Sequence, residues 1–218
     1  MMKSETASAD VTALLLAGGQ STRFGEANKL LAPYDGRPLI AHVFTAVSHV
    51  TDTRVVIAIQ ASEQRRALSE AVSQPDIVRF VADDQALEGP IAAIYGGLKA
   101  IETQWALVCA GDMLLVSAEA LRWLSAQHLS RHVDTVVSVN DGRIVEPLQA
   151  LYRRDAVERA VETLARSVGV RSLLSSLNDV LEVRVANNPS EADASLTDIN
   201  TQKQPAMLKD SREAAGGE

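Results

Sequence analysis

Short apolar runs rich in β-branched residues alternate along the chain with longer amphipathic stretches. Apolar runs of this kind, bounded by glycine, proline or polar residues, predict buried β-strands. Such strands are expected at residues 11–17, 54–59, 77–81, 105–109, 134–139, 147–152 and 181–185.

The amphipathic stretches between these runs predict helices. Pro90 suits the first turn of one helix, and Ser117 can cap the start of another. In the first stretch the apolar residues share one helical stripe, namely Leu39, Val43, Phe44 and Val47. Helices are therefore expected at residues 38–50, 62–72, 90–101, 117–127, 155–167 and 169–177.

The regular alternation of strand and helix predicts an α/β fold. We expect a single doubly wound, Rossmann-like, mostly parallel sheet with helices on both faces and right-handed crossovers. Ligands of such folds bind at the carboxyl ends of the strands. The domain is expected to span residues 11–203, between disordered tails at residues 1–10 and 204–218.

Composition narrows the class of protein. A chain of 218 residues, 46% hydrophobic and 22% charged, fits one soluble globular domain. Its net charge of −7 argues against a general nucleic-acid binder. The chain has one cysteine, Cys109, so no intrachain disulfide can form. Because no signal peptide and no membrane-spanning run is evident, we expect a cytoplasmic protein without membrane contact.

A glycine-rich loop follows the first expected strand, where residues 16–29 read LAGGQSTRFGEANK. Gly18 and Gly19 allow the backbone to turn sharply, and the amides of such a loop can bind phosphate oxygens. Arg23 and Lys29 bring two cations towards the same place. The spacing fits neither GxxxxGK[ST] nor GxGxxG. The alternative is a tight turn with solvated charges.

A second candidate is Asp112, which follows the expected strand at residues 105–109 in the sequence AGDM. A carboxylate at a strand end, next to Gly111, is well placed to hold Mg²⁺ together with substrate phosphates. The alternative is an Asx turn or a helix cap. His128 and His132 lack a third ligand, so zinc is not expected. Cys109 is expected to be buried and inert.

Taken together, these motifs resemble the nucleotidyltransferase superfamily that makes nucleotide sugars and, within it, the MobA-like molybdenum cofactor guanylyltransferases. The glycine loop, AGDM, GPIAAI at residues 89–94 and EPLQALYRR at residues 146–154 carry the resemblance. Leu114 stands where the family usually has proline, and Gln60 where some members have asparagine. The resemblance implies a nucleotidyltransferase-type fold.

The resemblance also implies roles for individual residues. Arg23, Lys29 and Asp112 would be catalytic, and Asp83 is preferred over Asp84 as a nucleotide contact because it lies nearer the strand end. The implied nucleotide-binding set is Leu16, Ala17, Gly18, Gly19, Arg23, Lys29, Asp83, Gly89, Pro90 and Asp112.

The implied metal ligands are Asp112 and Asn200, the latter in a late turn with the sequence TDIN. Glu146, Pro147 and Asn200 are the implied acceptor-binding residues, although Glu146 and Pro147 also fit an ordinary strand start with a surface carboxylate. The implied cofactor is Mg²⁺.

The implied reaction transfers GMP from GTP to the terminal phosphate of molybdopterin and releases pyrophosphate. The product would be the molybdopterin guanine dinucleotide cofactor. Molybdenum-insertion proteins or target-enzyme chaperones would be partners that hand over the acceptor. The alternatives are a molybdenum cofactor cytidylyltransferase, a sugar-phosphate nucleotidyltransferase, and a nucleotide-binding regulator without catalytic activity.

Overall fold

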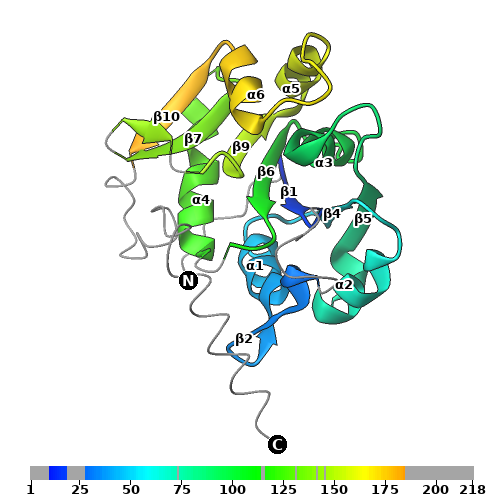
Figure 1. Cartoon of the computed structure of the whole chain (residues 1–218). Coiled ribbons are helices and arrows are strands. Elements are labelled where there is room, and N and C mark those ends of the chain that lie inside the picture. The colour runs from blue at the N-terminus through cyan, green and yellow to red at the C-terminus, as the bar shows by residue number, and fades with distance from the viewer. Residues whose placement is uncertain are drawn as a thin grey trace, which may run out of the picture.

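A computed structural model of the chain describes residues 10–18, 28–72, 74–113, 116–130, 132–140, 142–144 and 146–184. Its centre is an eight-stranded sheet with the order β10-β7-β9-β6-β1-β4-β5, in which β8 pairs with β7 (Figure 1). The strands are β1 (Val11–Leu16), β4 (Val55–Ile59), β5 (Val78–Ala82), β6 (Trp105–Ala110), β7 (Thr135–Asn140), β8 (Arg143–Ile144), β9 (Gln149–Arg153) and β10 (Val180–Arg184). Apart from Asp10, the tails expected to be disordered fall outside the described residues.

The sheet is mostly parallel, as the sequence predicted. β1 pairs in parallel with β4 and with β6, β4 with β5, and β7 with β10. The exceptions are β9, which runs antiparallel between β6 and β7, and the short β8. The carboxyl ends of β1, β4, β5 and β6 therefore meet at one edge of the sheet.

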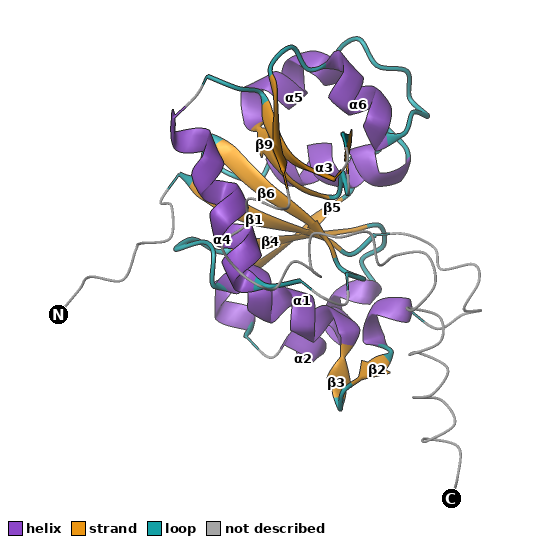
Figure 2. Cartoon of the chain, turned by 90° about the vertical axis from the view of Figure 1, so that its left-hand side faces the viewer, coloured by secondary structure: helices purple, strands orange, loops and turns teal. Residues whose placement is uncertain are grey.

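Helices cover both faces of the sheet, which confirms the predicted fold class (Figure 2). One face carries α1 (Leu39–Ser48), α2 (Gln64–Val72) and α4 (Ala118–Ala126). The other carries α3 (Gly89–Leu98), α5 (Arg154–Val161) and α6 (Val170–Ser176). The predicted cap is confirmed, because the Ser117 hydroxyl accepts a hydrogen bond of 3.2 Å from the amide of Ala120.

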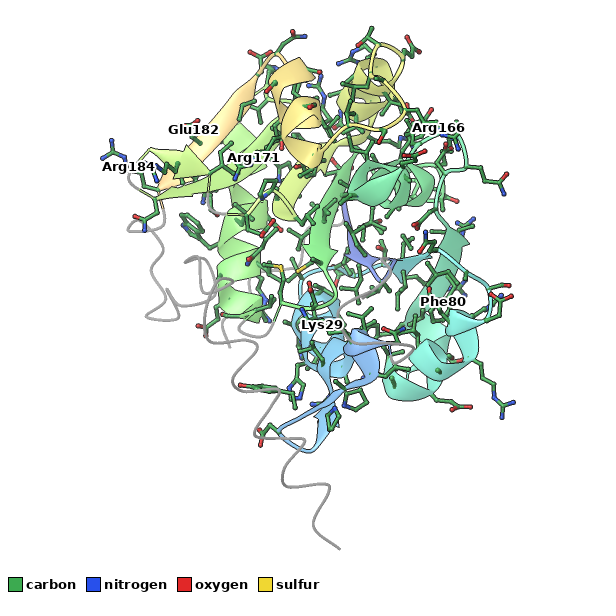
Figure 3. The ribbon with its side chains drawn as sticks, in the orientation of Figure 1. Lys29, Phe80, Arg166, Arg171, Glu182 and Arg184 are labelled. Carbon is green, nitrogen blue, oxygen red and sulfur yellow. The ribbon has the colours of Figure 1, made fainter. Side chains whose placement is uncertain are left out.

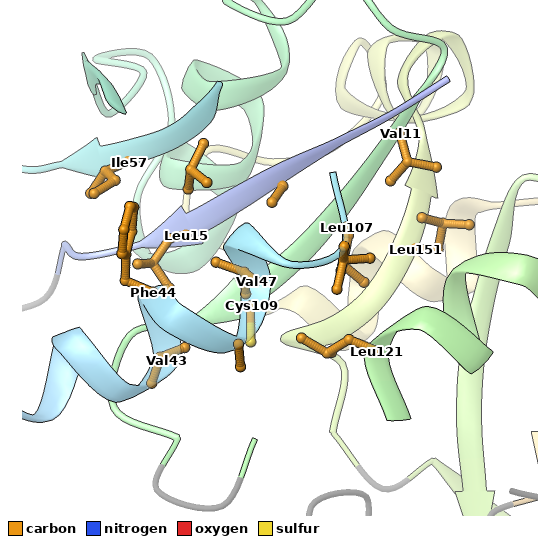
Figure 4. Packing of buried hydrophobic residues seen from close by; sticks show 14 of the residues in the cluster. Val11, Leu15, Val43, Phe44, Val47, Ile57, Leu107, Cys109, Leu121 and Leu151 are labelled. Carbon is orange, nitrogen blue, oxygen red and sulfur yellow. The ribbon is translucent and has the colours of Figure 1, made fainter. Parts of the chain in front are cut away.

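Two apolar clusters form the core, one on each face. Along β1, Ala13 and Leu15 face the helices α1 and α4, whereas Leu14 and Leu16 face α3. Figure 4 shows Leu15 beside Phe44 of α1 in the first cluster. All residues of β1 are buried, as expected for a strand covered on both sides. Burying each large apolar side chain contributes about 1.5–3 kcal/mol to folding.

Short elements and helix ends are where the sequence prediction was wrong or incomplete. A hairpin of β2 (Pro33–Tyr34) and β3 (Arg37–Pro38) turns at Asp35 and Gly36, whose φ angles are 45° and 73°. Two-residue strands carry no periodicity that a sequence can display. α5 ends at Val161 rather than at residue 167, because the chain tightens there into i→i+3 hydrogen bonds.

Among the helices of the described residues, none has the length and apolar character needed to cross a bilayer. The longest described helices, α1 and α3, have 10 residues each. A membrane-spanning helix needs about 20 apolar residues.

α3 packs very closely against the strands that end at the candidate site. A Cβ atom at Gly96 would lie 2.5 Å from the carbonyl oxygen of Ala82 and 2.9 Å from the amide nitrogen of Asp84. The amide of Asp84 also donates to the carbonyl of Ala92 in α3. Glycine at position 96 therefore sets the distance between α3 and the end of β5.

We expect Gly96→Ala to destabilise the protein by about 1–3 kcal/mol, because the methyl group would collide with backbone rather than with a flexible side chain. Urea unfolding measures this change, with Gly169→Ala as the control, since a Cβ at Gly169 meets nothing within 4 Å. Alanine normally favours a helix over glycine by about 1 kcal/mol, so a stabilised Gly96→Ala variant would contradict the close packing.

Candidate active site

The candidate site lies where β1 ends between its two parallel neighbours. Leu16, the last residue of β1, is in register with Ala58 of β4 and Ala110 of β6. The chain passes from β1 to β4 and β5 on one side of β1 and then, through α3, to β6 on its other side, and such a switch point is where doubly wound sheets bind ligands. A pocket of about 310 Å³ opens here.

Most of the described residues that the sequence assigned to a nucleotide line this pocket. They are Leu16, Gly18, Lys29, Asp83, Gly89, Pro90 and Asp112, together with Gln60. Ala17 is not among the lining residues, because it is buried and its amide donates to the carbonyl of Ala58. Gly19, Arg23 and Asn200 lie outside the described residues.

The sequence did not single out several other residues of the pocket wall. These are Leu30, Ala93, Ala110, Gly111 and Leu148. Each one adjoins or belongs to a motif that had been recognised, so the motifs located the wall. The motifs could not say which neighbouring side chain turns inwards. Glu146 and Pro147 are not among the residues that line the pocket, whereas the next residue, Leu148, is.

Lys29 and Asp112 form an ion pair in the pocket, with 2.8 Å between Nζ and Oδ2. Lys29 starts a 3₁₀ turn, Lys29–Leu31, which Asn28 caps by accepting a hydrogen bond from the amide of Leu30. Figure 3 shows Lys29 next to the turn that follows β6. The side chains are 18% and 43% exposed, respectively, so solvent can reach the carboxylate. The fold thus brings the two predicted motifs into direct contact.

The turn that carries Asp112 is tied to both neighbouring strands. The amide of Gly111 donates to the carbonyl of Leu16 over 2.9 Å, and the amide of Ala110 donates to the carbonyl of Leu148 over 2.9 Å. These bonds fix the turn relative to β1 on one side and to the start of β9 on the other. The Asp112 carboxylate is therefore anchored at the sheet edge.

Asp83 is half-buried and presents a carboxylate oxygen that lacks a partner among the described residues. Its Oδ1 atom is buried and has no hydrogen-bond partner among the described residues. Its Oδ2 lies so close to Gly18 that a Cβ there would be 2.7 Å away. Burial raises the pKa of Asp83 above its ordinary value. A buried carboxylate oxygen without a partner carries a cost in stability, which favours a role in binding.

Asp84, by contrast, is engaged in structural contacts. Its Oδ1 accepts a hydrogen bond from the amide of Ala86, and its Oδ2 pairs with Lys99 Nζ at 2.5 Å. The hydrogen bond from Lys99 lowers the pKa of Asp84. Asp84 is also absent from the pocket wall. The geometry therefore supports Asp83, rather than Asp84, as the residue that meets a ligand.

Other chemically notable residues have structural partners. Cys109 is buried in β6, and burial raises the pKa of its thiol. His128 is buried and hydrogen-bonds to the carbonyl of Ser125 through Nδ1, and its ring lies tilted against that of Trp105 with 5.0 Å between the ring centroids. Arg153 pairs with Asp134 at 2.8 Å, so it is held away from the pocket.

We expect Asp83→Asn to stabilise the apoprotein at pH 7. The raised pKa means that the folded state binds the proton more tightly than the unfolded state. The resulting stability is present below the unfolded pKa of about 3.9 and is lost as pH rises through the folded pKa. The gain from Asp83→Asn should therefore shrink as pH falls from 7 towards 4 in urea unfolding experiments.

Asp84→Asn is the matched control, with the opposite expected sign. Its lowered pKa stabilises the fold at neutral pH, and that stability is lost as pH falls through the folded pKa. A loss of stability in Asp83→Asn at pH 7 would show that the carboxylate has a stabilising partner after all.

The chain is similar in sequence to known nucleotidyltransferases. The model of the MobA-like NTP transferase domain family matches residues 13–180. A probable molybdenum cofactor guanylyltransferase of Natronomonas pharaonis is 31% identical over 177 residues, which cover 80% of this chain and 85% of the relative. A molybdenum cofactor guanylyltransferase of Pseudomonas putida is 29% identical over 198 residues, covering 90% and 95%.

Solved structures agree with this family. Molybdopterin-guanine dinucleotide biosynthesis protein A from Archaeoglobus fulgidus superposes with a TM-score of 0.69 at 26% identity, covering 94% of this chain and 98% of that one. The manganese complex of Rv0371c from Mycobacterium tuberculosis has a TM-score of 0.64 at 16% identity, covering 93% and 99%, and shares the fold. The chain therefore belongs to the MobA-like NTP transferase family and is a nucleotidyltransferase, as its motifs predicted.

Proposed function

We propose that this chain transfers GMP from GTP to the terminal phosphate of molybdopterin, forming molybdopterin guanine dinucleotide and pyrophosphate. The names of the relatives from Natronomonas pharaonis and Pseudomonas putida support the guanylyl donor and the acceptor. The observation that carries the proposal is the convergence of Lys29 and Asp112, 2.8 Å apart, in a pocket at the switch point of the sheet. A cation and a carboxylate in this position suit polyphosphate chemistry.

The nucleotide would occupy the part of the pocket formed by the ends of β1 and β5 and the start of α3. The absence of a side chain at Gly18 lets the Asp83 carboxylate approach the end of β1 closely, and Asp83 offers an acceptor without a partner in the described structure. Gly89 has a φ of 65° and is followed by Pro90, so α3 begins sharply at the pocket wall. The Asp83 carboxylate suits hydrogen-bond donors on a base or ribose.

Asp112 fits a divalent cation such as Mg²⁺. It supplies an accessible carboxylate, and Mg²⁺ is usually bound by one or two carboxylates together with substrate phosphates. Asn200 is the second ligand that we propose from the sequence. The cation would supply charge neutralisation on the phosphate oxygens. The solved structure of Rv0371c is a complex with manganese, which is consistent with a divalent cation in this fold.

The chemical step needs alignment and charge neutralisation more than proton transfer. An oxygen of the acceptor phosphate attacks the α-phosphorus of GTP and forms the new P–O bond. The bond from the α-phosphorus to the bridging oxygen breaks, and pyrophosphate leaves with the electron pair. Lys29 and Arg23 would offset the charge on the departing group. The attacking phosphate is already ionised, so no side chain has to remove a proton.

The acceptor would approach from the β9 side of the pocket. Leu148 lines the wall there, and Glu146 and Pro147 lie next to it in the chain. We place the reaction in the cytoplasm, where proteins that insert molybdenum or deliver the cofactor to its enzymes would hand over the acceptor.

The first test is nucleotide preference. We expect GTP with Mg²⁺ to raise the unfolding temperature more than CTP, ATP or UTP, because a ligand that binds only the folded state stabilises it by RT ln(1 + [L]/Kd). Release of pyrophosphate from GTP should then require molybdopterin. A preference for CTP would assign the chain to cytidylyl transfer, and binding without any pyrophosphate release would indicate a regulator.

Replacing Lys29 with Met should change metal and nucleotide binding in opposite directions. Without nucleotide, Mn²⁺ should bind about two- to fivefold more tightly, because Lys29 no longer competes with the metal for Asp112. A partly exposed ion pair of this kind contributes about 0.2–1 kcal/mol. GTP should bind roughly 10- to 100-fold more weakly, since hydrogen bonds to charged groups contribute about 1.5–3 kcal/mol. Electron paramagnetic resonance of Mn²⁺ and calorimetry measure the two constants.

Lys99→Met is the matched control, because Lys99 also pairs with an aspartate but that aspartate lies outside the pocket wall. It should leave both constants unchanged. Asp112→Asn should abolish the Mn²⁺ site while the folded state persists. Unaltered GTP binding in Lys29→Met would exclude Lys29 from the triphosphate site.

A further inference from the structure

The turn between β8 and β9 has a hydrogen-bond partner for each of its three successive carbonyl groups. The carbonyl of Glu146 accepts from the amide of Gln149 over 3.0 Å, and that of Leu148 accepts from the amide of Ala110. The carbonyl between them, that of Pro147, accepts from the hydroxyl of Tyr152 over 2.8 Å. Of these three hydrogen bonds, only the one to Pro147 has a side-chain donor.

The surroundings of Tyr152 favour this hydrogen bond. It is completely buried in β9, on the face that packs against α3 and α5. Burial raises the pKa of its hydroxyl, and the charge of Glu146 adds to the shift, so the hydroxyl stays protonated and donates. Pro147 is buried as well, so its carbonyl cannot exchange Tyr152 for water without opening the structure.

The turn is linked directly to the proposed reaction centre. Leu148 lines the pocket, and its carbonyl is bonded to Ala110, two residues before Asp112. The Glu146 carboxylate also folds back on the turn, accepting a hydrogen bond of 2.9 Å from the amide of Leu148. Any shift of the Pro147 carbonyl would therefore move Leu148 and the adjoining Glu146 relative to Asp112.

We propose that Tyr152 is a positioning residue, whose hydroxyl bond to the Pro147 carbonyl sets the Glu146–Leu148 turn in the place that receives the acceptor. This inference rests on the proposed function. Tyr152 touches neither substrate. Gly18, Lys29 and Asp83 on the nucleotide side make none of these turn contacts, whereas Asp112 is connected to the turn through Ala110. We therefore expect a larger effect on the acceptor than on the nucleotide.

The test compares Tyr152→Phe with Thr135→Val. Phenylalanine keeps the ring and removes the hydroxyl, which leaves the Pro147 carbonyl without its partner. Thr135 is equally buried, and its hydroxyl donates to the carbonyl of Leu151 over 2.8 Å in the same sheet. Thr135 is the cross-strand partner of Tyr152, so Thr135→Val removes a comparable bond from the same part of β9 without removing a bond to the turn, and it controls for a general loss of stability.

In Tyr152→Phe we expect the KM for molybdopterin to rise about three- to tenfold, as loss of one buried hydrogen bond allows, with a smaller change in the Kd for GTP. Hydrogen exchange should quicken at the amides of Ala110, Leu148 and Gln149 and stay unchanged in β1 and β4. Thr135→Val should change neither the acceptor KM nor exchange at these three amides.

The two readouts separate failure of the inference from failure of the proposed function. If the unaltered protein transfers nothing to molybdopterin, the proposed function fails, and exchange at the three amides still decides whether Tyr152 orders the turn. Unchanged exchange there overturns the inference. So does an unchanged acceptor KM in an active enzyme, or an equal rise in KM in Thr135→Val.

Discussion

The parallel pairing of β1 with both β4 and β6 is the constraint on which the rest of the structure depends. It places the end of the first strand between the ends of β4, which follows it in the chain, and β6, which is reached from β5 through α3. Backbone bonds continue this arrangement beyond the strands, since Gly111 donates to Leu16 and Asp83 donates to Ile59. The residues that follow these strands are consequently held at one edge of a rigid sheet.

This constraint explains why residues far apart in the sequence act at one place. Lys29 and Asp112 are 83 positions apart and belong to separate motifs, yet their side chains meet. Neither residue is on a strand, so their side chains are positioned by short turns that the ends of the strands hold in place. Sites built on such anchored turns combine a rigid support with access for a ligand.

The sequence predicted the order of strands and helices well, because each long element shows its own periodicity or buried run. It predicted the pocket only at the level of motifs. The choice between Asp83 and Asp84 depends on which carboxylate forms an ion pair within the protein. Lys99 forms that ion pair with Asp84, and it comes from another element. The orientation of Leu148 towards the pocket likewise depends on the hydrogen bond that its carbonyl accepts from the amide of Ala110. This bond joins two separate elements, so no local sequence pattern encodes it.

The two sides of the pocket differ in how well their polar groups are satisfied. On the nucleotide side, Asp83 keeps a buried oxygen without a partner in the described structure, which destabilises the apoprotein. On the acceptor side, each backbone carbonyl of the Glu146–Leu148 turn is bonded, one of them by Tyr152. A buried polar group without a partner contributes most to binding when a ligand supplies its missing hydrogen bond. A turn whose carbonyl groups are already bonded is ordered before binding, so it loses little conformational entropy when the ligand binds. The fold therefore supports affinity for the nucleotide through unmet hydrogen bonds and recognition of the acceptor through a preformed shape.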